Sequence, residues 1–372
     1  MLRLDKVGGL GIVNAVAERQ HHLTLDAMRG IAALGVVWFH LHFIIGYDSA
    51  GPLAVDFFFL LSGFVVASAY DSRLERDLNK ISFVQKRLVR MYPLFLAGLL
   101  LALVTQEVFI LKGFSRLDQH DTLLSFVVEL FWIPSPFNND AVTFPLNGPA
   151  WSLCFEILVN VLFALFHRHL TDRILLLLAI AAGSVVVAAV AILGSVNFGW
   201  SWPTFPLGLV RVMFSFPLGV LLWRYRERIP LSLGRVPPWL LLFGLGAVLV
   251  LPETRVSDIM FLLIGAPLLV AIGFRANGSR YAAAFRFLGE TSYPLYALHG
   301  TTILVLQGLV KRLHLGGWAL PIVVGYLLAM LLVSKASVMP DVTVRRALGR
   351  FLDRKGQPVR VGKVPDRILK PD

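Results

Sequence analysis

The sequence predicts an all-α fold in which about ten helices cross a membrane. Hydrophobic residues make up 56% of the 372 residues, charged residues only 16%, and the mean hydropathy is +0.71. This composition is typical of membrane proteins and not of soluble domains. Apolar runs long enough to cross a hydrocarbon core of roughly 30 Å recur from residue 25 onward.

The ten apolar runs are separated by short polar segments, except for one long connection over residues 112–147. Each run has about the 20 residues that a membrane-crossing helix needs. The expected spans are 26–46, 52–71, 91–111, 148–166, 173–193, 206–223, 238–252, 258–274, 291–310 and 318–338.

Basic residues indicate which side each end of these spans faces. If the N-terminus is cytoplasmic, the cytoplasmic segments hold 27 Lys and Arg residues and the outer loops hold five. The positive-inside rule then places both termini in the cytoplasm. We expect an N-terminal cytoplasmic segment (1–25), one transmembrane domain (26–340) and a basic cytoplasmic tail (341–372). No small-residue cleavage site follows the first run, so this run is expected to remain as an anchor.

Charge and cysteine content exclude several classes of function. The net charge is +12, but the basic residues are scattered between apolar runs, which argues for contact with the lipid bilayer and against a nucleic-acid partner. A single cysteine, Cys154, excludes an intramolecular disulfide and a cysteine-based metal cluster. His40 and His42 point roughly 200° apart on a helix, so no zinc site is expected. We predict no metal and no bound cofactor.

Ionisable residues inside the spans are the first functional candidates, because burying them in a bilayer is costly. Arg29 and His40 are eleven residues apart, which on a helix is roughly 20° beyond three turns and about 16 Å of rise. They therefore share one face. Arg29, near the cytoplasmic end, suits a phosphate or a carbonyl, or is an anchor that snorkels to the surface. His40 lies in the outer half, as a functional residue or as a histidine bonded to a nearby carbonyl.

Three further charged residues join this set. Arg87 and Arg90 are three apart on one helix face and suit a pyrophosphate or a 3′-phosphate; alternatively they are topology charges that attract anionic lipid. Glu156 is expected at a depth comparable with that of His40, where it would orient and polarise His40 or act as a base itself, strengthened by desolvation. The alternative is an ion pair between Glu156 and Arg211.

Small and polar residues in two other spans complete the candidates. Ser62 and Gly63 permit the close approach of another helix or of a ligand chain, with helix packing favoured. Asp56 opens the second span near the outer face. His299 falls in the predicted inner half of the ninth span, so we expect it to line a passage from the cytoplasm and not to accompany His40.

Five pieces of the sequence follow one another in the order found in a known family. The pieces are Arg29 with ten residues before His40, Asp56 to Gly63, Arg87 to Pro93, Trp151 to Glu156, and Gly289 to His299. Together they resemble the bacterial membrane acyltransferase-3 family, which includes O-antigen, exopolysaccharide and Nod-factor acetylases. The resemblance extends over residues 25–340.

This resemblance implies a multi-pass enzyme of the bacterial cytoplasmic (inner) membrane. Its expected reaction moves an acyl group, most often acetyl, from cytoplasmic acyl-CoA as co-substrate to a hydroxyl of a carbohydrate or glycolipid acceptor. His40 is the implied catalytic base, and Glu156 matches an acidic position of the family. The full assignment is His40 and Glu156 as catalytic, Arg29, Arg87, Arg90, Ser62, Tyr293 and His299 for acyl-CoA, and Asp56, Trp151 and Arg211 for the acceptor.

A multi-pass transporter or flippase is the alternative, in which Arg29, His40, Glu156 and Arg211 form a path for an anionic or lipid-linked substrate and a proton. Transporters often contain two repeated halves with broken helices in matching places. The sequence shows no such repeat by eye, and a cytoplasmic basic cluster fits an enzyme that uses CoA better.

Overall fold

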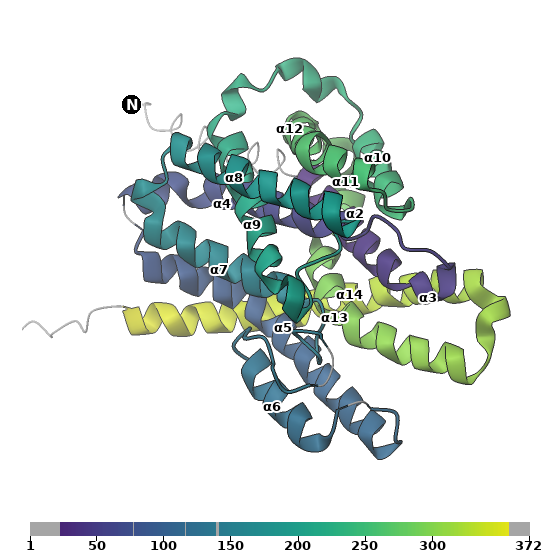
Figure 1. Ribbon diagram of the computed structural model, residues 1–372. Coiled ribbons are helices and arrows are strands. Elements are labelled where there is room, and N and C mark those ends of the chain that lie inside the picture. The colour runs from purple at the N-terminus through teal and green to yellow at the C-terminus, as the bar shows by residue number, and fades with distance from the viewer. Residues whose placement is uncertain (1–22, 77, 116, 139–140, 357–372) are drawn as a thin grey trace, which may run out of the picture.

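The computed structural model describes residues 23–356 apart from 77, 116 and 139–140, and this part of the chain is almost entirely helical (Figure 1). Within these residues, extended backbone pairs only at two isolated bridges, between Ser49 and Pro252 and between Val142 and Ser201. The predicted all-α fold of a polytopic membrane protein is confirmed.

The longer helices follow one another with short connections. Their bounds are α2 Leu23–His40, α4 Leu53–Arg76, α5 Lys80–Leu111, α6 Gln119–Glu129, α7 Ala150–Phe166, α8 Asp172–Leu193, α9 Phe205–Arg224, α10 Pro238–Val250, α11 Arg255–Met260, α12 Ala266–Arg275, α13 Ala282–Arg312 and α14 Ala319–Gly356. A short helix, α3 (His42–Ile45), follows α2, and a π-helical turn, Phe261–Gly265, joins α11 to α12.

Each of the ten predicted spans falls on a helix. Seven helical stretches are long and apolar enough to cross a membrane: Leu53–Arg76, Lys80–Leu111, Ala150–His169, Asp172–Leu193, Trp202–Arg224, Arg255–Arg275 and Ala319–Leu352. The apolar α10 is shorter, and α2 and α13 carry more polar residues. The number of crossings and the side of the termini stay predictions, and most of the 1–25 segment lies outside the described residues.

Several helix ends differ from the predicted spans. α5 begins at Lys80 and not at residue 91, α13 begins at Ala282 and not at 291, and α14 continues to Gly356, past residue 338. The first span is shorter than expected, because its helix ends at His40. Hydropathy marks the stretch that suits lipid, whereas a helix continues into polar residues wherever backbone hydrogen bonds and neighbours support it.

Two close helix pairs organise the molecule: α4 packs along α9, and α2 packs along α13. A Cβ atom on Gly63 of α4 would lie 2.1 Å from the Phe216 carbonyl oxygen, and one on Gly219 of α9 would lie 2.0 Å from that of Leu60. The predicted use of Gly63 in helix packing is confirmed. Gly30 of α2 likewise faces the Leu288 carbonyl of α13. These glycines let the backbones touch and thereby set how far each helix is shifted along its partner.

Candidate active site

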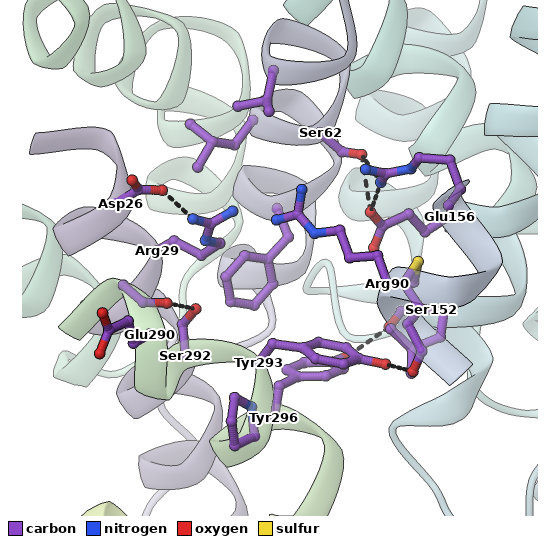
Figure 2. A pocket seen from close by; sticks show the side chains of 18 of the residues that line it. Asp26, Arg29, Ser62, Arg90, Ser152, Glu156, Glu290, Ser292, Tyr293 and Tyr296 are labelled. Carbon is purple, nitrogen blue, oxygen red and sulfur yellow. Dashed lines mark hydrogen bonds and ion pairs between the residues drawn. The ribbon is translucent and has the colours of Figure 1, made fainter. Parts of the chain in front are cut away.

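A cavity of about 370 Å³ lies between α2, α4, α5, α7, α13 and α14. Figure 2 shows this cavity from close by. Its charged lining consists of Asp26, Arg29, Arg87, Arg90, Glu156, Arg286, Glu290, Asp341 and Arg345.

Most of these charges are paired. Arg29 is hydrogen-bonded to Asp26 on the next turn of α2, and Arg345 lies 2.6 Å from Asp341 on α14. Arg90 and Arg286 differ, because no hydrogen bond or ion pair joins either guanidinium to another described residue, and both side chains are exposed. Figure 2 shows that Arg29 and Arg90 both reach into the open space. The cavity therefore offers guanidinium donors to an anionic ligand.

Glu156 lies on the wall formed by α7. Its carboxylate accepts a 2.9 Å hydrogen bond from Arg87 on α5 and a 3.0 Å hydrogen bond from Ser62 on α4. The expected partnership with His40 is wrong, and so is the alternative pairing with Arg211. Glu156 projects from the side of α7 that faces α4 and α5, so its hydrogen bonds link three helices. Its ion pair also engages the guanidinium of Arg87, which the sequence had assigned to phosphate binding.

Aromatic and hydroxyl groups form another part of the wall. The rings of Phe58 and Tyr296 meet edge to face with their centroids 5.5 Å apart. The Tyr296 hydroxyl lies 2.5 Å from the Ser152 hydroxyl and donates to the Pro149 carbonyl at 3.3 Å. These contacts hold the ring in place. Its ring centroid lies 5.7 Å from that of His299, so Tyr296 contacts both the cavity and one of a pair of histidines.

The two histidines are His40 at the end of α2 and His299 within α13, with ring centroids 5.2 Å apart. The expectation that His299 lies apart from His40 is wrong, and neither ring is among the groups that line the cavity. The error comes from helix register. Gly30 facing Leu288 slides α13 along α2 so that His299 reaches the level of His40. The predicted ninth span started at residue 291 and therefore had placed His299 nearer the cytoplasm than His40.

Arg29 does lie on the same side of α2 as His40. Arg29 lines the cavity together with Gly289 of α13, and His40 contacts His299 further along the same helix. The predicted shared face is confirmed, and it is the face that packs against α13.

The three residues assigned to the acceptor form a separate cluster. Arg211 of α9 makes two hydrogen bonds to Asp56 of α4, at 2.6 and 3.2 Å, and its guanidinium lies 5.3 Å from the Trp151 ring centroid. It also donates to the carbonyls of Phe198 and Pro52. Asp56 and Arg211 are each 1% exposed, so other protein groups surround both side chains. Direct contact with a substrate stays a prediction.

Several residues of the cavity were not predicted from the sequence. The predicted Tyr293 does line the cavity, and it donates a hydrogen bond to the Met91 carbonyl of α5. Tyr296, three residues later, lay unremarked in the same stretch, although positions three apart share a helix face. Asp341 and Arg345 were placed in a cytoplasmic tail. No local signal distinguished them, because their place in the cavity depends on α14 continuing past Pro340.

Comparison with known proteins is consistent with this arrangement. A family model described as "Acyltransferase domain" (acyltransferase-3) matches residues 22–336. The chain is 34% identical over 187 residues to "Protein 2 in picA locus" of Rhizobium radiobacter, covering 46% of this chain and 95% of that protein. It is 29% identical over 155 residues to "O-acetyltransferase OatA" of Staphylococcus aureus, covering 40% of this chain and 25% of that protein.

A third relative is "O-acetyl transferase" of Shigella phage Sf6, which is 25% identical over 217 residues, or 55% of this chain and 58% of that protein. The chain thus spans only part of the length of these two named O-acetyltransferases. No solved structure matches the chain significantly. The family match covers most of the sequence, including α2, α4, α5, α7 and α13, whereas the cavity residues of α14, Asp341 and Arg345, lie beyond its end at residue 336. The chain belongs to the acyltransferase-3 family of membrane acyltransferases.

Proposed function

We propose that the protein is an O-acyltransferase that takes an acyl group, normally acetyl, from cytoplasmic acyl-CoA and transfers it to a hydroxyl of a carbohydrate or glycoconjugate at the bacterial inner membrane. The family and the names of two relatives support acyl transfer. The geometry of the cavity supports the acyl-CoA donor and the roles of the residues, and the resemblance to the family supports the carbohydrate acceptor.

The observation that carries the proposal is the guanidinium-lined cavity beside the His40 and His299 pair. CoA carries phosphates at one end and a thioester at the other, so it needs cations at a water-accessible mouth and an apolar inner part. The Asp26 and Glu290 side chains are 41% and 45% exposed, which places the mouth on their side. Arg90 then offers donors for a phosphate, while Phe58 and Tyr296 border the opposite, inner end.

Transfer itself needs a base, because the acceptor hydroxyl must lose its proton as it attacks. His40 is half-buried and has no hydrogen-bond partner among the described residues, so a ring nitrogen is free for this role. The acceptor oxygen bonds to the acyl carbon, the C–S bond breaks, the proton passes to His40, and the CoA thiolate leaves and is protonated. Exclusion of water from the site favours the acceptor over hydrolysis.

The test uses purified protein in detergent with radiolabelled acetyl-CoA, and native membranes as the source of acceptor. We expect His40→Ala to bind acetyl-CoA as the wild type does but to lower CoA release roughly 10²- to 10⁴-fold, the usual contribution of a general base. Arg90→Ala is expected to weaken acetyl-CoA binding with little change in the rate at saturation.

Arg173→Ala is the matched control, since Arg173 is an exposed arginine outside the cavity at the start of α8. It should leave both quantities unchanged. If folded wild-type protein binds no acyl-CoA of any chain length, the enzyme proposal fails and the transporter alternative takes its place. If Arg173→Ala weakens binding as much as Arg90→Ala does, general surface charge and not the cavity accounts for the affinity.

A further inference from the structure

The ring of His299 is held in one orientation by its own helix. Its Nδ1 lies 2.8 Å from the Tyr296 carbonyl oxygen and 3.2 Å from the Leu295 carbonyl oxygen. Both neighbours are acceptors, so Nδ1 must carry the proton and donate to them. The side chain is 0% exposed, and no described carboxylate pairs with it, so the ring is neutral. The tautomer with a proton on Nδ1 and a lone pair on Nε2 follows.

That Nε2 lone pair is buried and has no hydrogen-bond partner in the described part of the chain. Buried polar atoms without a partner are rare and call for a reason. The ring that lies beside it is His40, with its centroid 5.2 Å away and its plane tilted by 41°. No hydrogen bond to another described residue holds the His40 ring, so a small rotation is open to it.

We propose that His299 positions His40 for proton abstraction by accepting a hydrogen bond from one ring nitrogen of His40 at Nε2. This inference rests on the proposed function. With one His40 nitrogen donating to His299, the other nitrogen carries the lone pair and faces the acceptor hydroxyl. When His40 takes the proton from that hydroxyl, the imidazolium keeps its hydrogen bond to His299, which strengthens because the donor is now charged.

The surroundings of His299 fix its place. Tyr326 of α14 hydrogen-bonds Thr302 at 2.8 Å and donates to the His299 carbonyl oxygen at 3.4 Å, while the Tyr296 ring packs against the ring of His299. His40 in turn is bordered by the Phe39 ring, at 5.2 Å between centroids. Among the described residues no carboxylate pairs with either histidine in the way that orients the histidine of a serine hydrolase triad, so a neutral histidine takes the orienting role here.

Substitution of His299 by either of two amide side chains distinguishes a positioning role from a purely structural one. An Asn at position 299 replaces the Nδ1–H donor but leaves nothing at the Nε2 position, whereas a Gln can place its carbonyl oxygen at the Nε2 position. We therefore expect His299→Gln to keep most of the kcat for CoA release from acetyl-CoA in native membranes. His299→Asn should lose roughly 10- to 100-fold in kcat, as partners that orient a reactive group commonly do. KM for acetyl-CoA should be unchanged in both.

The same substitutions at His120, which is exposed on α6, serve as controls and should not change kcat. Melting temperatures in detergent show that each variant is folded. The reverse order, with Asn active and Gln inactive, would mean that only the Nδ1 contacts matter and would overturn the proposal. So would a rise in KM at constant kcat, which would assign His299 to donor binding.

The proposed function and this inference fail in different ways. Loss of activity in His40→Ala with wild-type activity in both His299 variants would overturn the pairing alone. Absence of acetyl-CoA binding in the wild type would overturn both.

Discussion

The carboxylate of Glu156 shows how a single residue gains its role from its partners. It lies in a stretch that resembles the family at an acidic position, yet it bonds Arg87 and Ser62 and makes no hydrogen bond to His40. The side chains of Arg87 and Glu156 are only 7% and 20% exposed. Removing one charge of such a pair leaves the other charge poorly solvated, so it destabilises the folded protein more than removing one charge of an exposed pair does.

We expect Glu156→Gln to lower the free energy of unfolding by roughly 2 to 4 kcal/mol, because Arg87 then lacks a counter-charge. Thermal unfolding in detergent measures this. Glu290→Gln is the matched control: Glu290 pairs with Lys335 at 2.7 Å, with side chains 45% and 47% exposed, so its loss should cost no more than ~1 kcal/mol. Equal shifts for the two variants would contradict the account of Glu156.

At the scale of the helix, glycine contacts determine which residues meet. α4 and α9 touch through Gly63 and Gly219, and α2 and α13 touch at Gly30. The second contact carries His299 to the level of His40. A hydropathy profile contains no information on this shift, since it records where a helix suits lipid and not how it lies along its neighbour.

Gly63→Ala is expected to destabilise the protein severely, since its Cβ would lie 2.1 Å from the backbone oxygen of Phe216 and two helices must move apart. Gly244→Ala in α10 is the matched substitution, with no atom within 4 Å of the added Cβ. Better helix propensity should make it neutral or stabilising by up to about 1 kcal/mol. Yield and melting temperature in detergent compare the two, and a tolerated Gly63→Ala would disprove the close contact.

At the scale of the whole molecule, α6 and the far end of α5 extend from the bundle at the bottom of Figure 1. Glu129, the last residue of α6, ties this part to the segment before α7. Its carboxylate is fully buried and accepts hydrogen bonds from the backbone N–H groups of Leu146 at 3.0 Å and Asn147 at 3.2 Å. Burial raises the pKa of Glu129 to about 8, against the opposing effect of the two N–H donors.

This raised pKa predicts a dependence of stability on pH. The folded state binds the Glu129 proton more tightly than the unfolded chain, so the stabilisation is complete below the ordinary pKa of 4.5 and is lost as the pH rises through about 8. The loss is at most ~5 kcal/mol for a shift of this size. Glu129→Gln should flatten the melting temperature between pH 5 and 9.

Glu227→Gln, at a glutamate that is 78% exposed, should leave that profile unchanged. A wild-type melting temperature that rises over this pH range would show that Glu129 is ionised in the folded state.

The sequence by itself determined the helical class, the position of the apolar runs, the family and the shared face of Arg29 and His40, because hydropathy and the 3.6-residue period act within one segment. Only the tertiary structure decided that Glu156 meets Arg87, that Asp56 meets Arg211, that α14 brings Asp341 into the cavity and that His299 meets His40. These pairs join different helices, and their register depends on close backbone contacts that no single segment encodes.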